Sequence, residues 1–243
     1  MDGRIFRKQE LAGEMNWWIS GRRQLFAEIL ALAPMPLERS ILEIGPGVGS
    51  NLGVLQVNEK TRVVVADVDQ EALEYCAKLG YTDSFIISSE RFPIEDGTFQ
   101  FVLAADVLEH VPNDREMMSE ISRVLQRGCQ CVVTVPAFRS LWSEHDRLAG
   151  HQRRYRRAEL IEIVDQERLE IVDIRYFNWI LFVPTLVVKK TLRFIKPREY
   201  ADATSIPGFL NTALRYLFTF DIRISKRIRI PFGISLLMIV KKL

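Results

Sequence analysis

A glycine-rich turn that directly follows a short apolar segment constrains the fold of this 243-residue chain more than any other feature. The segment covers residues 41–44, and Gly45, Gly47 and Gly49 follow it at alternate positions. Because glycine has no Cβ, such a turn lets a ligand approach the backbone where a strand passes into a helix. A purely structural turn is the alternative, but the acidic residue Glu43 just before the turn favours a cofactor site.

A second acidic residue, Asp67, ends the next apolar segment, residues 62–66, and lies eighteen residues after Gly49. A carboxylate at the end of a strand beside such a turn can accept hydrogen bonds from two ribose hydroxyls. The alternative is that Asp67 caps a helix that starts near Gln70. The two roles are compatible, and we expect the ribose-binding role.

Short apolar segments recur along the first half of the chain and predict buried parallel strands. They are apolar at nearly every position rather than alternating, which is typical of strands that helices cover on both faces. They span residues 41–44, 62–66, 84–87, 99–105 and 131–135. Helical segments lie between them, one ending at Gly80 and another running from an Asn113–Glu116 capping box to Gly128. This alternation predicts an α/β fold with a doubly wound sheet.

The chain is expected to form a single domain with four parts. Residues 1–36 form an N-terminal helical lid, 37–176 a cofactor-binding core, 177–232 a basic and hydrophobic helical insertion, and 233–243 the last strand. Late in the core, a polar and arginine-rich loop over 138–157 precedes a short helix and a strand near 169–176. The final strand is expected over 234–240.

Composition excludes several classes of protein. Hydrophobic residues make up 48% of the chain and charged residues 26%, which excludes disorder and fits one globular domain. The net charge of +2 lacks the strong positive field of a dedicated nucleic-acid binder, so we expect no nucleic-acid partner. The charge is uneven, however, because residues 187–243 hold twelve Lys and Arg but only three Asp and Glu. This basic segment either covers the substrate or lies on an anionic membrane surface.

Cysteine usage and apolar run lengths bear on location. Cys76, Cys129 and Cys131 are too few for a disulfide framework and include no zinc-type pair, so we expect a reducing compartment, core thiols and no metal site. The first residues show no secretory apolar stretch, and the longest apolar run, residues 179–188, is too short to span a bilayer. A cytoplasmic location is expected, with peripheral membrane contact through the basic segment as an addition.

Five motifs in order resemble class I S-adenosylmethionine-dependent methyltransferases. They are the glycine turn with Glu43, the acidic strand end at Asp67, the loop over 91–99, the Asp-Val-Leu-Glu-His-Val segment over 106–111, and the turn and strand over 125–136. The resemblance implies a Rossmann-like, seven-stranded sheet whose last strand is antiparallel. It also implies that the cofactor is S-adenosyl-L-methionine and that the activity is methyl transfer.

The resemblance assigns roles to individual residues. Glu43 with Gly45, Pro46, Gly47 and Gly49 would hold the methionine part of the cofactor, Asp67 the ribose, Val68 one adenine face, and Ser88 and Ser89 the adenine edge, while Asp106 and Val107 complete the cofactor-binding set. The chain departs from the family at Ser88, where an acidic residue is frequent. A serine hydroxyl can still hydrogen-bond to adenine.

Two flanking signatures resemble a subgroup of these enzymes that often modifies lipid-linked, polysaccharide-related or secondary-metabolite substrates. One contains Trp17, Trp18 and Arg22; the other runs over 141–155 and contains His145, His151, Arg153, Arg154 and Tyr155. With His110, the tryptophans, the three arginines and Tyr155 form the candidate substrate-binding set. Their arginines suit an anionic acceptor. The alternatives are a solvated charged face for the arginines, core packing for the tryptophans, and a structural role for His110, which can shape the pocket by hydrogen-bonding the backbone.

The expected reaction is an in-line displacement that the protein accelerates mainly by positioning. If the acceptor is a hydroxyl, His145 or His151 would take its proton, and Asp106 is a further candidate for orienting acceptor or cofactor. A nicotinamide-dependent oxidoreductase is one alternative, although Ser50 stands where the dinucleotide fingerprint has its third glycine. A non-catalytic membrane-surface module on the same fold is another. The acceptor atom, oxygen, nitrogen or carbon, stays open.

Overall fold

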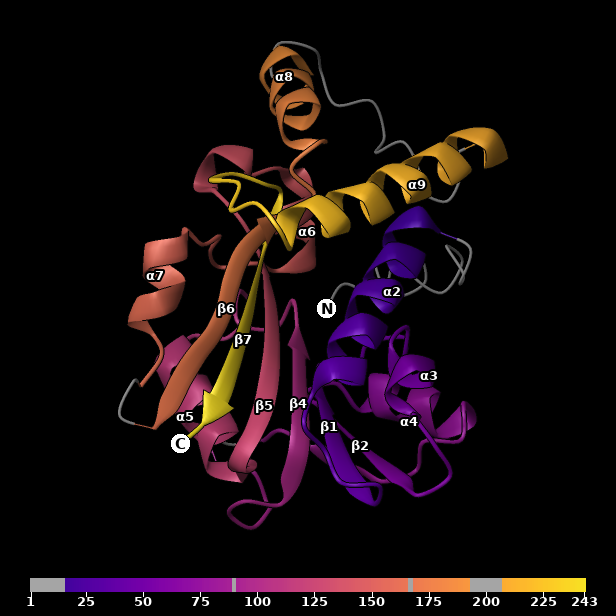
Figure 1. The fold of residues 1–243 in the computed structure, drawn as a ribbon, viewed down its shortest axis with the longest axis vertical. Coiled ribbons are helices and arrows are strands. Elements are labelled where there is room, and N and C mark those ends of the chain that lie inside the picture. Colours follow the sequence, from indigo (N-terminus) through magenta and orange to yellow (C-terminus); the bar gives the residue numbers. More distant parts are fainter. Residues whose placement is uncertain (1–15, 89–90, 166–167, 193–206) are drawn as a thin grey trace.

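A seven-stranded sheet organises the protein in the computed structural model, which describes residues 16–88, 91–165, 168–192 and 207–243. The strand order is β3-β2-β1-β4-β5-β7-β6 (Figure 1). The strands are β1 Arg39–Ile44, β2 Thr61–Asp67, β3 Ser84–Ile86, β4 Phe99–Ala105, β5 Leu125–Pro136, β6 Leu169–Phe177 and β7 Ser235–Lys242. Only β7 runs antiparallel to its neighbours β5 and β6. The predicted sheet with an antiparallel last strand is therefore confirmed.

Helices cover both faces of the sheet, as the solid apolar strands predict. On one face, α2 Trp17–Leu32, α3 Leu52–Leu55, α4 Gln70–Lys78 and α9 Gly208–Ser225 bury side chains against the sheet. On the other face, α5 Asp114–Val124 and α7 Arg157–Glu162 do so. In β1, Ile41 faces the first layer and Leu42 and Ile44 face the second. None of these side chains is more than 1% exposed.

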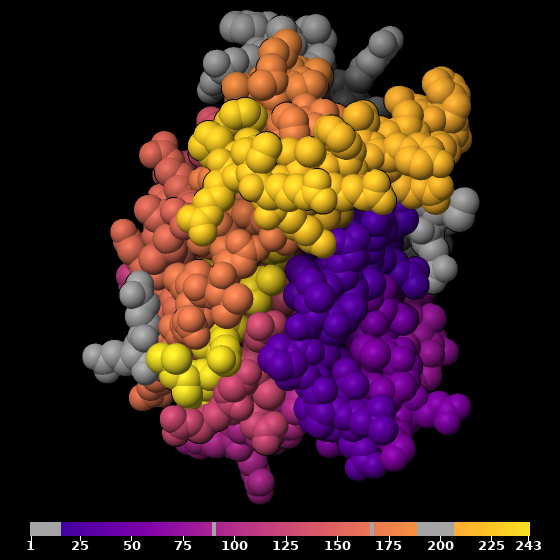
Figure 2. Space-filling view, viewed as in Figure 1, coloured from indigo at the N-terminus to yellow at the C-terminus, as the bar shows by residue number. Residues whose placement is uncertain are grey.

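The remaining helices lie near the carboxyl ends of the parallel strands. They are the 3-10 turn η1 Arg139–Leu141, α6 Glu144–Ala149 and α8 Phe182–Leu192. Figure 1 shows α9 crossing this end of the sheet over the N-terminal part of α2. On the face seen in Figure 2, α9 lies on the outside of the molecule. Within the described residues, no helix is long and apolar enough to cross a membrane.

One local prediction was wrong. The helix that was expected to close at Gly128 ends at Val124, because Leu125 already pairs with Phe99 as the start of β5. The alternative reading of Asp67 as a helix cap does not hold, because the cap of α4 is Asp69, whose side chain accepts a hydrogen bond from the Glu71 amide. The predicted cap of α5 is confirmed, since Asn113 accepts a hydrogen bond from the Glu116 amide.

Aromatic packing fastens α9 to α2. Phe218 of α9 makes edge contacts with Trp17 and Trp18, and Trp18 also stacks on Phe177 at the end of β6. Gly21 stands where a Cβ would meet the Phe218 ring at 2.5 Å, so only glycine permits this close approach. Both tryptophans therefore belong to a structural cluster at the carboxyl edge of the sheet.

A buried carboxylate also holds α9, one turn beyond Phe218. Asp221 accepts hydrogen bonds from the backbone amides of Asn178, Trp179 and Ile180 at distances of 2.7, 2.6 and 3.2 Å. These amides directly follow β6, so a single side chain attaches α9 to the sheet. Hydrogen bonds to a charged acceptor contribute about 1.5–3 kcal/mol each, which makes α9 a well-anchored part of the fold.

Candidate active site

The glycine turn adopts a backbone conformation that side chains disfavour. Gly45, Gly47 and Gly49 have φ angles of +67°, +53° and +66°, all in the left-handed region. A Cβ on Gly45 would also meet Cγ2 of Val107 at 2.8 Å, so the turn passes close to the end of β4. The helix that follows, α3, begins only at Leu52. The turn therefore presents bare backbone at the carboxyl edge of the sheet.

Glu43 lies fully buried beneath this turn. Asn51 Nδ2 donates a 2.8 Å hydrogen bond to Glu43 Oε1, whereas Oε2 has no partner among the described residues. Burial is the main cause that raises the pKa of Glu43 to about 7. A buried carboxylate with a free oxygen at a strand end suits a polar or cationic ligand group.

Asp67 stands one strand away, at the end of β2. Burial raises the pKa of its carboxyl, which accepts hydrogen bonds from the backbone amides of Asp69, Gly47 and Val68. Val68 is 71% exposed and Ser88 is exposed, so both are open to solvent beside this strand end. Ser89 lies outside the described residues. Glu43, the glycine turn and Asp67 thus lie next to one another along the carboxyl edge of the sheet.

Asp106 links the end of β4 to the N-terminal helix. Its φ of +57° is unusual for a residue with a side chain. Its Oδ2 forms a 2.7 Å ion pair with Arg22 of α2, and Thr134 donates to its Oδ1 at 3.1 Å. Arg22 also lies over the rings of Trp18 and Phe26, at 5.7 and 5.5 Å. Arg22, predicted to bind substrate, is therefore directed at Asp106.

His151 is held by a buried carboxylate that sequence inspection missed. Its Nδ1 lies 2.9 Å from Oδ1 of Asp146, which is fully buried at the start of α6. Arg154 donates from Nε and Nη2 to the two Asp146 oxygens, and Ser143 donates from its backbone and hydroxyl. Although burial raises the pKa of Asp146, these donors together hold it well below its ordinary value. The Ser143-x-x-Asp146 capping-box spacing was the available sequence signal.

Glu109 and His110 both lie beside His151. His151 Nε2 lies 4.0 Å from Glu109 Oε1, and the His110 and His151 ring centres are 4.7 Å apart. Glu109 is fully buried, and neither of its oxygens has a hydrogen-bond partner within the described ranges. Burial, together with nearby Asp106, raises the pKa of Glu109 well above its ordinary value. Burial and His151 lower the pKa of His110 to about 4, so its ring is neutral at pH 7.

Three predicted substrate contacts pair with other side chains of the protein. Arg154 is buried by its pairing with Asp146, and Tyr155 is 3% exposed with its hydroxyl 2.8 Å from Asp114 Oδ2. Arg153 forms a 2.8 Å ion pair with Asp114. These contacts join the loop after β5 to the start of α5. These contacts hold the loop in place, and binding of an acceptor by these residues stays a prediction.

His145 lies at the margin of the cluster, with its ring centre 6.1 Å from that of His151. The structure thus brings together Asp106, His110 and His151 from the predicted set and adds Glu109 and Asp146. The predicted core cysteines are confirmed, since Cys76, Cys129 and Cys131 are all buried.

Part of this chain is similar in sequence to known proteins. Residues 42–133 match a family model described as a methyltransferase domain. The chain is 31% identical over 108 residues to an uncharacterized 37.1 kDa protein in transposon TN4556 of Streptomyces fradiae, and 28% identical over 125 residues to an uncharacterized protein of Methanocaldococcus jannaschii. These matches cover 42% and 51% of this chain, but only 31% and 58% of the two relatives.

Solved structures share the fold at low sequence identity. A methyltransferase solved with the Haloferax volcanii Trm112 activator gives a TM-score of 0.62 at 18% identity, covering 99% of this chain and 94% of that one. Geranyl diphosphate methyltransferase gives 0.62 at 15%, covering 92% and 78%, and the [4+2]-cyclase SpnF gives 0.58 at 19%, covering 90% and 79%. Because SpnF is named as a cyclase, the fold by itself does not specify the reaction.

Proposed function

We propose that this chain, whose residues 42–133 form a methyltransferase domain on the class I fold, transfers a methyl group from S-adenosyl-L-methionine to a small or lipid-linked acceptor. The observation that carries the proposal is the left-handed glycine turn between the buried Glu43 and Asp67. When bound, S-adenosyl-L-methionine supplies a methyl group activated by a positively charged sulfur. The chain then has to hold and orient the two reactants.

The residues at this edge fit such a ligand. Glu43 has a buried oxygen without a described partner, suited to a cationic or hydrogen-bonding group, and Gly45 leaves room that a Cβ would fill. Asp67 offers a carboxylate to ribose hydroxyls, and the exposed Val68 offers an apolar surface to a base. Pro46, Gly47, Gly49, Ser88, Asp106 and Val107 complete the proposed cofactor-binding set.

Direct binding distinguishes this proposal from the alternatives. Isothermal calorimetry on the whole folded chain is expected to show one site for S-adenosyl-L-methionine and for its demethylated product, S-adenosylhomocysteine. NADH is expected to give no heat. Binding of NADH in place of the sulfonium donor would instead favour an oxidoreductase. Cooperative unfolding shows that the protein is folded. If such protein binds neither ligand, the methyltransferase proposal is wrong.

We further propose that the His151 cluster prepares the acceptor. If the acceptor is a hydroxyl, its proton has to be removed or weakened before the displacement. His151 is oriented by Asp146 and turns its Nε2 toward Glu109, and Asp106 lies at the adjacent strand end. His145 stands farther out as a second candidate. His151→Gln is therefore expected to lower turnover more than His145→Gln, with cofactor affinity unchanged in both; equal effects would remove His151 from this role.

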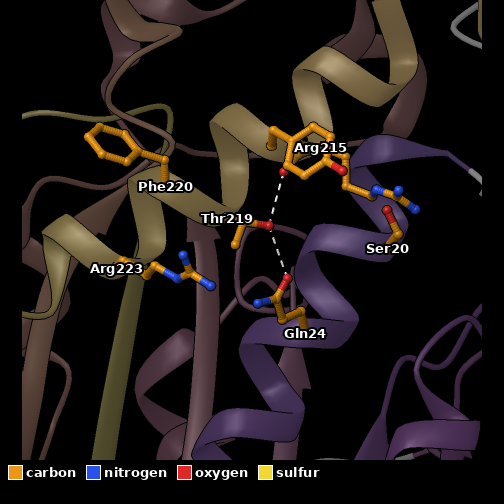
Figure 3. Close-up of a pocket in the computed structure, with 7 residues that line it drawn as sticks. Ser20, Gln24, Arg215, Thr219, Phe220 and Arg223 are labelled. Carbon is orange, nitrogen blue, oxygen red and sulfur yellow. Dashed lines mark hydrogen bonds between the residues drawn. The ribbon is translucent and has the colours of Figure 1, made fainter. Parts of the chain in front are cut away.

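The basic segment offers a surface for an anionic, partly hydrophobic molecule. A groove of about 620 Å³ lies between α2 and α9 (Figure 3). Its lining consists of Ser20, Gln24, Arg215, Tyr216, Thr219, Phe220 and Arg223. Thr219 Oγ1 donates to Gln24 Oε1 at 3.0 Å across the groove. Ser20 and Gln24 lie on the opposite side of α2 from Arg22, so this groove is separate from the proposed reaction centre.

We propose that this groove and the outer face of α9 rest on an anionic membrane surface. Phe209 is 80% exposed, Tyr216 67% and Phe220 53%, beside the exposed cations Arg215 and Arg223. Apolar side chains bordered by cations suit an anionic lipid surface, where each cation contributes about 1 kcal/mol. A lipid-linked acceptor would then be presented beside the site.

Vesicle binding tests the membrane contact. The chain is expected to sediment with vesicles of phosphatidylcholine and phosphatidylserine, but not with phosphatidylcholine alone. The double variant Arg215→Ala/Arg223→Ala is expected to bind about 30-fold more weakly, from the loss of about 2 kcal/mol. Arg62→Ala/Arg147→Ala, which removes two exposed cations elsewhere, is the matched control. If both double variants lose the same affinity for the vesicles, the binding reflects only the general attraction of cations to an anionic surface.

A further inference from the structure

We propose that Glu109, His110 and His151 bind a divalent transition-metal ion at the carboxyl edge of β4. Each residue offers one ligand atom, and these three atoms lie within 4.8 Å of one another. Two imidazoles and one carboxylate form a donor set that zinc and non-haem iron(II) use in proteins. The cysteine spacing of the chain gives no indication of this site, because none of its ligands is a thiolate.

Glu109 gives the strongest indication of a missing cation. The carboxylate is fully buried, and neither oxygen has a hydrogen-bond partner in the part of the chain that the structure describes. Leaving a buried carboxylate ionised without a partner is energetically costly. Its Oε1 faces Nε2 of His151 at 4.0 Å. A metal ion between these two atoms would satisfy both.

Both histidines are also hydrogen-bonded to other parts of the protein. Nδ1 of His151 is held by Asp146 at 2.9 Å, and the His110 ring is hydrogen-bonded to the backbone of Gly150. Metal-binding histidines characteristically donate their second ring N–H to a carboxylate or a backbone carbonyl, which orients the ring. Both histidines therefore have the outer support that a metal site requires, and each retains one nitrogen for a ligand bond.

Backbone contacts hold the two ligand-bearing loops together. The Gln152 amide donates to the Glu109 carbonyl at 2.7 Å, and Gln152 Nε2 donates to the His110 carbonyl at 2.8 Å. Gln152 directly follows His151, so the three candidate ligands are fastened to one another. Zinc bonds of about 2.0–2.2 Å place ligand atoms about 3.0–3.5 Å apart, a spacing that small side-chain rotations would reach.

The surrounding charges favour a cation here. Asp146 is paired with Arg154, and Asp106 with Arg22, so each of these carboxylates is already balanced. Glu109 is the remaining carboxylate of the cluster. If the proposed methyl transfer is correct, a metal ion at this point would bind an acceptor oxygen and lower the pKa of an acceptor hydroxyl, with His151 acting as its ligand in place of the direct proton acceptor proposed above. Metal binding itself does not depend on that function.

Metal titration of the full chain tests the site. Protein treated with a chelator and dialysed is titrated with Zn²⁺ by calorimetry and with Co²⁺ by visible absorption. One ion per chain is expected, with a cobalt spectrum typical of mixed nitrogen and oxygen ligands. Zn²⁺ is also expected to raise the unfolding temperature. Absence of binding to well-folded protein at millimolar metal would overturn the proposal.

Three variants identify the ligands. Glu109→Gln and His151→Gln are each expected to weaken Zn²⁺ binding about 100-fold or more. His145→Gln, which changes a neighbouring histidine outside the set, is expected to bind as the parent does. Glu109→Gln keeps the shape of the side chain and removes the group that can ionise, so its folding is expected to be intact. Unchanged affinity in Glu109→Gln would overturn the assignment.

Cofactor binding measured on the same metal-free protein separates the two proposals. If S-adenosyl-L-methionine binds and Zn²⁺ does not, the methyltransferase proposal stands and the metal site is wrong. If Zn²⁺ binds with the predicted variant pattern and S-adenosyl-L-methionine does not, the metal site stands and the proposed function is wrong.

Discussion

Two ligand-facing regions share the carboxyl edge of the sheet but are built in different ways. The glycine turn between β1 and α3 consists mainly of backbone, and its two carboxylates, Glu43 and Asp67, lie within one strand–turn–strand segment. The histidine cluster consists of side chains from 106–110 and 143–154, two loops about forty residues apart. Local conformation therefore makes the first region, whereas contacts between distant loops make the second.

The two regions also differ in how charge is balanced. In the histidine cluster, Asp106 and Asp146 are each paired with an arginine. Within the described residues, no ion pair reaches Glu43 or Asp67. A carboxylate without an arginine partner remains available to a cationic ligand group, and in the histidine cluster this applies to Glu109. Four substitutions test this contrast, from the largest expected effect to the smallest.

Asp146→Asn tests whether the histidine cluster depends on its buried ion pair. The change leaves Arg154 buried without a charge partner, which costs about 3–5 kcal/mol. Chemical unfolding is expected to show this loss, and the His151 ring to lose its orientation. Glu144→Gln, which removes an exposed ion pair two residues away, is expected to leave stability unchanged. Equal effects of the two changes would contradict the structural role of Asp146.

Glu43→Gln tests whether the turn carries an unbalanced charge. The folded pKa, about 7, lies above the ordinary value of 4.5, so ionisation destabilises the ligand-free protein as pH rises from about 4.5 to 7. The variant is expected to match the parent in stability near pH 4 and to exceed it by up to about 3 kcal/mol at pH 8. Urea unfolding at both pH values measures this difference. A stability difference between variant and parent that does not change with pH would contradict this expectation.

Gly45→Ala tests the backbone of the turn. At φ +67° a Cβ costs about 1–2 kcal/mol, and its contact with Val107 adds to this. Affinity for S-adenosyl-L-methionine is expected to fall about 30-fold, from a loss of about 2 kcal/mol. Gly128→Ala is the matched control, because Gly128 has φ +77° with nothing within 4 Å of the added atom. The control is expected to lose stability but not cofactor affinity.

Tyr155→Phe tests the attachment between the loop after β5 and the start of α5. The change removes a hydroxyl that lies 2.8 Å from Asp114 Oδ2 and 3.1 Å from the Leu108 carbonyl. A loss of about 1.5 kcal/mol is expected in urea unfolding, with cofactor affinity unchanged. Tyr216→Phe, at an exposed position on α9, is expected to have no effect. A lower affinity of Tyr155→Phe for the cofactor would show that this attachment and the glycine turn are energetically coupled.

Sequence patterns predicted the sheet and the turn because both follow from neighbouring residues. Apolar strands buried on both faces, the Asn113 cap and the left-handed glycines are properties of short segments. Sequence patterns were less informative where a distant partner decided the outcome. Leu125 pairs with Phe99 and ends α5 early, and the contacts of Arg154 with Asp146 and of Tyr155 with Asp114 could not be read from neighbouring residues.

By itself, the sequence determined the strand–turn–strand unit that presents Glu43, Gly45 and Asp67, since each backbone conformation there depends on the residues beside it. The tertiary structure alone decided that Asp146 supports His151 and that Glu109 is buried without a partner. The reason is physical: the sequence is consistent with many pairings of charged side chains, and only the close approach of the folded loops selects which pairs form.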